Sequence, residues 1–410
     1  MKSKANLYSW MGALGILALM GFSALGYQLV NGLGVTGMNN AVSWGLYITM
    51  FMFFVGLSAG GLIVSSSATV FNIPAFKVVA KPATILSTVC IIVAGIFIMV
   101  DIGSPERLLN LLLHSQFKSP LMWDVCVITL YLSINVLYLY LMTRPKPDPK
   151  KMKIMSSVAL PVAILVHSVT AWIFGLQIAR EGWHSALMAP LFVASALDSG
   201  LALLIIVLVL LIKFKLFTVE KKLITSLAGL LVTCVAVDAY FVFSEVLTMY
   251  YPQEESVMLI LNEMLKGSMA PFFWGEVILG FVIPLAILLF SKNRQKTGLV
   301  IFSSVLVVIG VFFKRVWLLF TSFIYPHVEG APGITLGKYI PGEDPSVVPN
   351  FWLKHGQYAP TLVELMIVVG MIAFGTLLFI VLSRRILLAS SKEAQQPKQN
   401  QSRERLTAAQ

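Results

Sequence analysis

Residues 187–212 read LMAPLFVASALDSGLALLIIVLVLLI, and Asp198 is the one charged side chain among these 26 residues. A helix needs about 20 apolar residues to cross the hydrocarbon core of a bilayer. A helix that is apolar on every side is also unsuited to the surface of a soluble domain. The stretch therefore predicts a membrane-spanning helix.

Nine further segments share this length and character, and they cover 7–31, 41–70, 79–102, 121–143, 154–179, 222–249, 271–291, 297–325 and 360–383. Of all 410 residues, 58% are hydrophobic and 12% are charged. Soluble domains average about half apolar and about a quarter charged residues, so the soluble class is excluded. We predict an all-α polytopic membrane protein with about ten transmembrane helices. Its membrane domain covers 1–385, and a polar cytoplasmic tail covers 386–410.

The basic residues are distributed unevenly along the chain. Of the 30 Lys and Arg residues, 22 lie at the N-terminus, after every second span or in the C-terminal segment. Cytoplasmic loops of membrane proteins are enriched in these residues. We therefore expect a multi-pass protein of the cytoplasmic (inner) membrane with both termini in the cytoplasm. The net charge of +11 then reflects topology and does not indicate nucleic-acid binding.

The cysteines and histidines do not suggest a bound metal centre. Cys90, Cys126 and Cys234 lie in apolar runs without CxxC spacing, so we expect small buried side chains and no iron–sulfur cluster or zinc site. Of five histidines, only His167 is plainly within a span, which argues against a haem held by two histidines. A chain without such a centre cannot carry electrons far, and it requires an electron-carrying partner.

The outer loops contain apolar, partly helical pieces. Ser104 can cap and Pro105 can open a short helix, and a second amphipathic helix is predicted around 256–266. The longest outer loop, 326–359, is rich in Gly, Pro and aromatic residues. Its aromatic side chains fit either interfacial anchoring or a docking surface for an extracytoplasmic partner.

Ionisable side chains within spans are costly, so each is a functional candidate. Most of them lie nearer the outer end of their helix, whereas the inner half offers mainly hydroxyls. Lys314 and Arg315 need acidic partners at their depth, which would form either structural ion pairs or a proton-handling network. The candidates are Asp101, Asp124, Asp198, Asp238, Glu245, Glu276, Lys314, Arg315 and Glu364.

One pair has matched depth. His167 lies 16 residues before Trp183 and Asp198 lies 15 residues after it, on the two arms of a helical hairpin. Imidazole titrates near neutrality and a carboxylate can orient it, so the pair suits proton exchange with a quinone carbonyl. A plain interhelical hydrogen bond is the alternative. The polar and aromatic mouth of this predicted quinone site would consist of Gln177, Arg180, Trp183 and His184.

Five segments in order resemble the NrfD/PsrC family, the membrane subunits of polysulfide-reductase-type complexes. They are SWGLYITMFMFFVGLSAGG (43–61), DIGSPERLLNLLLHSQFKSPLMWDV (101–125), LPVAILVHSVTAWIFGLQ (160–177), SALDSGLAL (195–203) and HGQYAPTLVE (355–364). The ten-span length is most similar to the longer branch. That branch includes the membrane subunits of hydrogenase-2-type, Dsr and quinone-reductase complexes and of alternative complex III.

The resemblance implies two four-helix bundles plus additional helices and no bound redox cofactor. It also implies a menaquinone or other quinone at the outer side, beside a ferredoxin-like iron–sulfur subunit that serves a catalytic subunit. By similarity, His167 and Asp198 match the quinone-site residues. The residues that fall where such proteins are proposed to handle protons are Asp101, Glu106, Arg107, Asp238, Glu245, Glu276, Lys314 and Arg315.

Our hypothesis from the sequence is a quinone-reactive membrane anchor of a respiratory oxidoreductase complex, with possible coupling to proton translocation. Such a subunit is not catalytic alone. Ten spans with Gly and Pro interruptions and midplane charges also fit a secondary transporter. A third hypothesis is a structural anchor whose charges only join helices.

Overall fold

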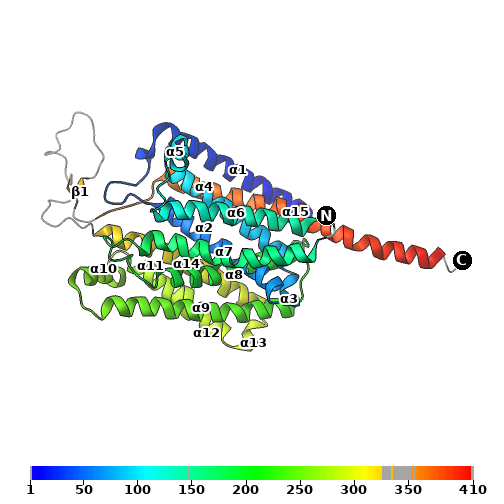
Figure 1. The fold of residues 1–410 in the computed structure, drawn as a ribbon. Helices are drawn as coiled ribbons and strands as arrows, with labels where there is room; N and C mark the ends of the chain where they lie inside the picture. Colours follow the sequence, from blue (N-terminus) through cyan, green and yellow to red (C-terminus); the bar gives the residue numbers. More distant parts are fainter. Residues whose placement is uncertain (1, 146, 326–333, 336–351, 354–355, 408–410) are drawn as a thin grey trace.

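The computed structural model describes residues 2–145, 147–325, 334–335, 352–353 and 356–407. Within these residues, ten helices are long and apolar enough to cross a membrane, which confirms the prediction of about ten spans. They lie side by side along one axis (Figure 1). Since a bilayer offers backbone groups no water, helices that satisfy their own hydrogen bonds are the expected solution.

Eight of the spans form two bundles of four. The first bundle consists of α2 (Leu46–Val70), α4 (Ala80–Asp101), α6 (Pro120–Thr143) and α7 (Pro149–Gly175). The second consists of α8 (Met188–Lys213), α9 (Lys221–Tyr250), α14 (Thr297–Ile324) and a span of three parts, namely α11 (Ala270–Gly275), the π-helix η3 (Glu276–Val282) and α12 (Ile283–Leu288). The two-bundle arrangement therefore agrees with the expectation from the family resemblance.

The bundles meet where α2 crosses α8. At this crossing a Cβ atom added to Gly60 would lie 2.2 Å from the carbonyl carbon of Gly200. Small residues allow transmembrane helices to approach at backbone distance. This crossing fixes the bundles against each other beside the buried charges described below.

The remaining two spans form a pair outside the bundles. They are α1 (Lys2–Asn31) and α15 (Leu362–Thr407), which contact each other closely and pack through α15 on α4. The apolar part of α15 ends at Leu387. The helix then continues through the predicted polar tail, where it projects from the bundle (Figure 1).

Short elements connect the spans. They are η1 (Leu33–Val35), α3 (Pro74–Lys77), η2 (Pro105–Arg107), α5 (Leu108–Leu113), α10 (Glu255–Lys266), α13 (Ser291–Arg294) and an antiparallel pair of two-residue strands, β1 (Ile334–Thr335) and β2 (Trp352–Leu353). The helix predicted around 256–266 is thus present as α10. Most of the loop predicted as an aromatic anchor or docking surface, with His327 and His355, lies outside the described residues.

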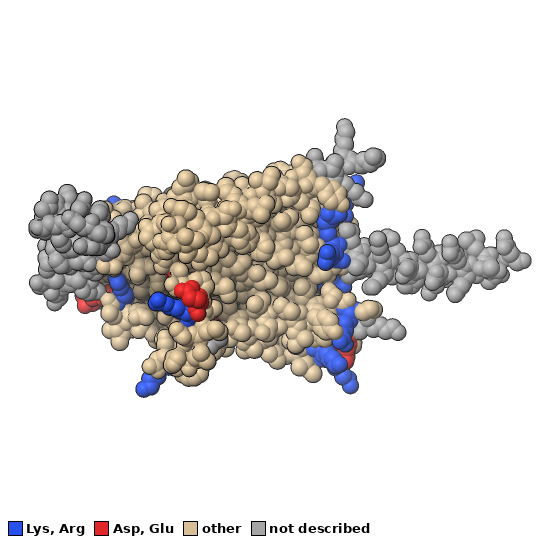
Figure 2. Space-filling view, turned by 90° about the horizontal axis from the view of Figure 1, so that it is seen from above, with Lys and Arg blue, Asp and Glu red and all other residues tan. Residues whose placement is uncertain are grey.

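The two ends of the spans differ in charge. We call the end at which α1 begins and α15 projects the terminal face, and the opposite end the loop face. Lys and Arg form a band at the terminal face (Figure 2). This distribution is the one on which the predicted orientation rests.

Some details differ from the prediction. The second span begins at Leu46. The fifth covers Pro149–Gly175, and it ends there because the chain turns before Gln177. Cys126 is exposed on the surface of α6 and is not buried as expected, since that face of the helix has no neighbouring helix within the described chain. Ser104 makes no capping hydrogen bond, although Pro105 does open the short helix.

Candidate functional site

The buried charges of the second bundle gather at one level of the membrane domain. All five side chains are 0% exposed, and they come from three helices and the π-helix. Such groups are rarely buried without a role or a partner. This charged cluster consists of Asp198 on α8, Asp238 on α9, Glu276 at the start of η3, and Lys314 and Arg315 on α14.

Lys314 bridges two carboxylates. Its Nζ lies 2.7 Å from Oδ1 of Asp238 and 3.5 Å from Oε1 of Glu276. The indole Nε1 of Trp317, one turn along α14, donates to Oε2 of Glu276 at 2.6 Å. A buried ion pair is stable only when its remaining polar atoms find partners. Oδ2 of Asp238 has no such hydrogen bond, so the pairing is incomplete.

Arg315 points toward the other bundle. Its Nη2 donates to Oγ of Ser195 at 2.6 Å, and its guanidinium lies 4.2 Å from the ring centroid of Phe192. Gly56 on α2 lies beside it, because a Cβ there would lie in van der Waals contact with Nη2 at 3.4 Å. Nε and Nη1 make no hydrogen bond. Arg315 thus keeps free donor capacity in an apolar setting.

Asp198 lies in the same cluster, and among the described residues neither of its carboxylate oxygens has a hydrogen-bond partner. It interacts electrostatically with Asp238 and Lys314. The cluster holds three carboxyl groups and two cations, so full ionisation would leave one negative charge in a dry interior. Burying net charge is costly. Neutrality therefore requires one additional proton.

His167 on α7 lies beside this cluster and is 1% exposed. Its Nδ1 lies 2.6 Å from the carbonyl oxygen of Ala163, and its Nε2 lies 2.9 Å from that of Val55 on α2. A neutral imidazole donates from only one nitrogen, so two facing acceptors are both satisfied only when the ring is doubly protonated. Arg315 interacts with it electrostatically. Two cations side by side repel each other, so the guanidinium of Arg315 opposes a charged ring and favours placing the additional proton on a carboxyl group.

His167 and Asp198 lie at similar depth, as the hairpin argument expects. His167 is 8 residues from the end of α7 and Asp198 is 10 residues from the start of α8, which places them about 12 and about 15 Å from the loop face. Within the described residues no hydrogen bond joins them. Instead, Arg315 interacts electrostatically with both.

Aromatic side chains separate His167 from the loop face. Trp183, 3% exposed, stacks on Trp44 and meets the edges of Phe174 and Phe323 at 5.2 and 5.1 Å. Its Nε1 donates to the carbonyl of Leu318 at 2.8 Å. Trp183, one of the predicted mouth residues, is therefore buried among aromatic side chains and does not line an open cavity entrance; we call this aromatic group the aromatic plug.

The other mouth residues lie around this plug. Arg180 donates to the carbonyl of Ser322 at 2.7 Å, and partial burial lowers the pKa of its guanidinium below its ordinary value. Gln177 is exposed in the connection after α7. His184 is exposed, with Nδ1 3.0 Å from the carbonyl of Gly175. Of these four residues, His184 alone lines a cavity described below.

That cavity opens at the loop face between the α7–α8 connection and the end of α9. We call it the outer cavity, and its volume is about 330 Å³. Oγ of Ser185 donates to Oε2 of Glu245 at 2.7 Å on its wall. It is lined by Glu181, His184, Ser185, Ala186, Leu187, Glu245, Thr248, Met249, Pro252, Glu254 and Val257.

A narrow inner crevice lies next to the outer cavity, and Glu245 and Met249 line both. Its volume of about 20 Å³ suits one water molecule. Trp317 lines it and donates to Glu276. Leu191, also on its wall, lies one helical turn before the Ser195 that binds Arg315. The side chain of Trp317 thus lies between the crevice and the charged cluster.

The remaining candidates lie elsewhere. Glu364 accepts hydrogen bonds from Tyr358 and from the amides of Gly37 and Thr361, which anchors the segment before α15. Burial and this carboxylate raise the pKa of Tyr358. Asp101 ends α4 with Oδ1 unpaired. Glu106 and Arg107 are exposed at the loop face. Asp124 accepts from Thr170 at 2.7 Å within the first bundle.

Sequence reasoning missed the neutral partners in this region. Ser195 precedes Asp198 by three residues and Trp317 follows Lys314 by three, so each shares a helix face with its charged neighbour. That spacing could have identified them. Ser185 and the crevice could not be found in this way, because they depend on how α9 and α10 pack beside the α7–α8 connection.

Comparison with known proteins gives one family. The family profile described as "Polysulphide reductase, NrfD" matches residues 34–327. A relative from Halobacterium salinarum, named as a putative membrane subunit of dimethyl sulfoxide reductase, is 37% identical over 390 residues. The match covers 90% of this chain and 88% of the relative.

Two further relatives have names that mention menaquinol or menaquinone. The "Hdr-like menaquinol oxidoreductase integral membrane subunit" of Archaeoglobus fulgidus is 31% identical, covering 89% of this chain and 91% of the relative. The "Menaquinone reductase, integral membrane subunit" of Nitratidesulfovibrio vulgaris is 24% identical, covering 76% of this chain and 80% of the relative.

Proposed function

The chain belongs to the NrfD polysulphide reductase family, and we propose that it is the quinone-reactive membrane subunit of a respiratory oxidoreductase complex. Two relatives named for menaquinol or menaquinone support menaquinone or a similar quinone as the diffusible substrate. The reaction is the interconversion of quinone and quinol, in which two electrons pass to or from an electron-carrying partner subunit and two protons are released or taken up.

The outer cavity is the proposed site of the quinone ring. Its size of about 330 Å³ lies at the lower end of small-molecule sites, and its walls combine apolar side chains with a few polar groups. A quinone has two carbonyl oxygens that need donors, and its quinol has two hydroxyls that need acceptors. His184 and the Ser185–Glu245 pair offer both kinds of group.

The observation that carries the proposal is the unbalanced charged cluster, to which Trp317 of the crevice wall is hydrogen-bonded. Its three carboxyls and two cations accommodate one additional proton, and Trp317 donates to Glu276 of the cluster. A group that gains and loses a proton beside a quinone site suits proton-coupled electron transfer. A merely structural network would be expected to have its polar atoms paired, but Asp198 has neither oxygen paired.

His167 and Asp198 remain part of the proposed site. Both side chains are buried, and the inner crevice of about 20 Å³ is too small for a quinone ring. We therefore assign them to the inner proton-accepting station, on the two sides of Arg315. Glu245 then passes protons between the quinone and this station.

The electron-carrying partner is proposed to dock at the loop face, where the outer cavity opens. The names of relatives describe membrane subunits of oxidoreductases, which supports an electron-transfer subunit and a catalytic subunit as partners. We propose that this electron-transfer subunit is a ferredoxin-like iron–sulfur protein on the extracytoplasmic side. The basic band at the terminal face supports cytoplasmic termini in the cytoplasmic membrane.

The transporter hypothesis has less support. Transporters with inverted repeats break helices in both halves. Among the described spans, the π-helix η3 interrupts one span of the second bundle, and Gly60 on α2 and Gly200 on α8 lie in continuous helices. The relatives are also named as oxidoreductase subunits.

A direct binding measurement tests the proposed site. The full chain in detergent is titrated with a short-chain menaquinone, and binding is followed by quenching of tryptophan fluorescence. Glu245→Gln and His184→Leu should each raise the Kd by about 10-fold, because each removes a polar contact worth about 1.5 kcal/mol. Glu220→Gln, at the exposed start of the same helix, is the matched control.

Two outcomes decide the test. A raised Kd in both cavity variants together with an unchanged Kd in the control supports the outer cavity as the ring site. A wild-type Kd in both cavity variants would exclude it, since a ring held elsewhere would not depend on His184 and Glu245.

A further inference from the structure

One span of the second bundle contains a segment of wide helix. This segment is the π-helix η3, at whose end the amide of Ile283 donates to the carbonyl of Ile278, five residues before it. Among the described residues it is the one π-helix. Such segments are rare within α-helices and are often found at functional sites. Glu276 of the charged cluster is the first residue of η3.

The buried positions of this span recur at every fourth residue. They are Glu276, Gly280, Pro284 and Leu288. In a straight α-helix of about 3.6 residues per turn, each such step turns the side chain by about 40°, so Glu276 and Leu288 would lie about 120° apart around the axis. A π-helix has more residues in each turn, which offsets this rotation. The wide segment therefore keeps Glu276 on the buried face of α12.

Close contact between η3 and α14 completes this placement. A Cβ added to Gly280 would lie 3.2 Å from the Cα atom of Gly310, so the two backbones approach each other directly. Small residues permit such an approach between transmembrane helices. As a result, the carboxylate of Glu276 lies 2.6 Å from Nε1 of Trp317 and 3.5 Å from Nζ of Lys314.

Pro284 favours the wide turn. It is the second residue of α12 and is buried. Proline has no amide hydrogen, and in a continuous α-helix its ring would collide with the carbonyl four residues before it, here that of Gly280. A wide turn ahead of the proline relieves this collision. Pro284 therefore disfavours the rewinding of η3 into an α-helix.

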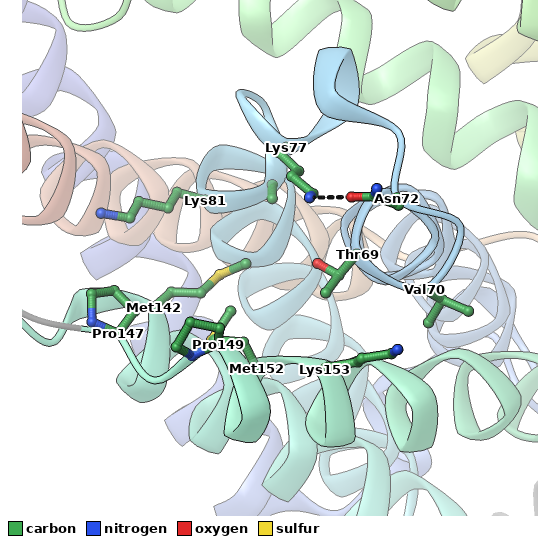
Figure 3. A pocket seen from close by; sticks show the side chains of 11 residues that line it. Thr69, Val70, Asn72, Lys77, Lys81, Met142, Pro147, Pro149, Met152 and Lys153 are labelled. Atoms are coloured by element: carbon green, nitrogen blue, oxygen red, sulfur yellow. Dashed lines mark hydrogen bonds between the residues drawn. The ribbon is translucent and has the colours of Figure 1, made fainter.

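A proline alone does not require a π-helix, as α7 shows. Pro149 begins that helix at the terminal face (Figure 3), where a missing amide hydrogen leaves no helical bond unmade. Pro161 lies in its interior, and α7 nevertheless stays α-helical along its whole length. Pro161 is exposed, whereas Pro284 is buried on the same face as Glu276. The wide segment thus accompanies the proline that shares a face with a buried charge.

We propose that Pro284 is a positioning residue for proton exchange at the charged cluster. It holds the wide turn of η3, and η3 places the carboxylate of Glu276 between Lys314 and Trp317. Trp317 lines the inner crevice, so the carboxylate is held at the side of the cluster that faces the crevice. This inference rests on the proposed function, in which the cluster exchanges protons during quinone turnover.

The placement itself is tested without quinone. Pro284→Ala restores an amide hydrogen and allows η3 to rewind. The full chain in detergent, with tryptophan labelled by nitrogen-15 at the indole nitrogen, gives a magnetic resonance signal for the N–H of Trp317, which Trp317→Phe identifies. This signal should move upfield in Pro284→Ala, because the hydrogen bond to Glu276 is lost. Pro161→Ala, the matched change inside α7, should leave it unchanged.

Quinol-linked electron transfer by native membranes is then measured with the same variants. Pro284→Ala and Glu276→Gln should each lower the rate by more than about 10-fold. Their combination should lower it no further, because both changes act through one carboxylate. Deleting Ile278 from Pro284→Ala removes the one residue that the wide turn adds. Glu276 then returns to its face in an ordinary α-helix, and most of the rate should be restored.

Three outcomes would overturn the inference. An unchanged Trp317 signal in Pro284→Ala would exclude the positioning role, whatever the rate. A combined variant far slower than either single variant would also exclude it, since Pro284 would then act on more than the carboxylate of Glu276. A moved signal with a wild-type rate would leave the placement correct and exclude its use in proton exchange, and that failure would belong to the proposed function.

Discussion

In the bundle of α2, α4, α6 and α7 the buried polar side chains are mostly hydroxyls, whereas the bundle of α8, α9, η3 and α14 buries five charged side chains beside its hydroxyls. The hydroxyls form short bonded chains. Oη of Tyr131 lies 2.9 Å from Oγ of Ser87, and Oη of Tyr138 lies 2.8 Å from Oγ of Ser156. Within the described residues, the charged bundle leaves Asp198, Asp238 and Arg315 with unpaired atoms, whereas the first bundle leaves Ser66, Asn135 and Asp101 with one each.

This difference separates groups that hold helices together from groups that can react. Tyr131 and Tyr138 are seven residues apart on α6 and reach the carbonyls of Ser58 and Ser65, also seven apart on α2. Such a repeat joins two helices along their length, and each bond is satisfied locally. The incomplete pairing of the second bundle lacks this regularity and is costly for stability, which favours a role in proton exchange.

The largest effect is expected from Lys314→Met. The change leaves Asp238 and Glu276 buried without their shared cation, at a cost of about 3–5 kcal/mol. We expect a large loss of thermal stability of the purified chain, measured by its unfolding temperature in detergent. Adding Asp238→Asn should recover part of the loss, because one of the two uncompensated charges is then removed.

The control for this comparison is Lys213→Met at the exposed end of α8, which should leave the unfolding temperature near that of wild type. A Lys314→Met protein as stable as this control would mean that the carboxylates are already neutral. The buried charges of the second bundle would then not reduce stability as the comparison between the bundles assumes.

A smaller structural effect and a clear functional one are expected from Asp198→Asn. Neither oxygen of Asp198 accepts a hydrogen bond, so the amide should change the unfolding temperature little. It does remove a proton-exchanging group from the cluster. We expect quinol-linked electron transfer by native membranes to fall by more than about 10-fold, within the range of general acid–base contributions.

Asp124→Asn is the matched change in the first bundle, where the carboxylate accepts from Thr170 and an amide oxygen can do the same. It should keep electron transfer near the wild-type rate. Equal rates in the two variants, high or low, would show that the carboxylates of both bundles have the same importance for electron transfer. The functional difference between the two bundles would then be wrong.

The sequence predicts the framework well and the site in part. Ten apolar segments fix ten spans because hydrocarbon length is a strong constraint, and the acids near Lys314 could be named because a buried cation needs them. The depth argument also places His167 and Asp198 at one level. It could not predict that Arg315 interacts with both residues. Which side chains meet depends on how each helix is rotated about its axis, and that rotation is set by contacts between helices such as the one between Gly56 and Arg315. Cavities depend on such rotations even more.

The smallest effect is expected from Tyr138→Phe. The change removes the hydroxyl that bonds Ser156 at 2.8 Å and leaves the ring in place, so it should lower stability by about 1–2 kcal/mol. Electron transfer should stay near the wild-type rate, because the hydrogen-bonded hydroxyls of the first bundle join α6 to α2 and α7 and lie outside the charged cluster. A contrary outcome is a rate that falls as far as in Asp198→Asn while the unfolding temperature is unchanged. The hydroxyls of the first bundle would then take part in proton movement, and the assignment of a structural role to the first bundle and a proton-exchange role to the second would be wrong.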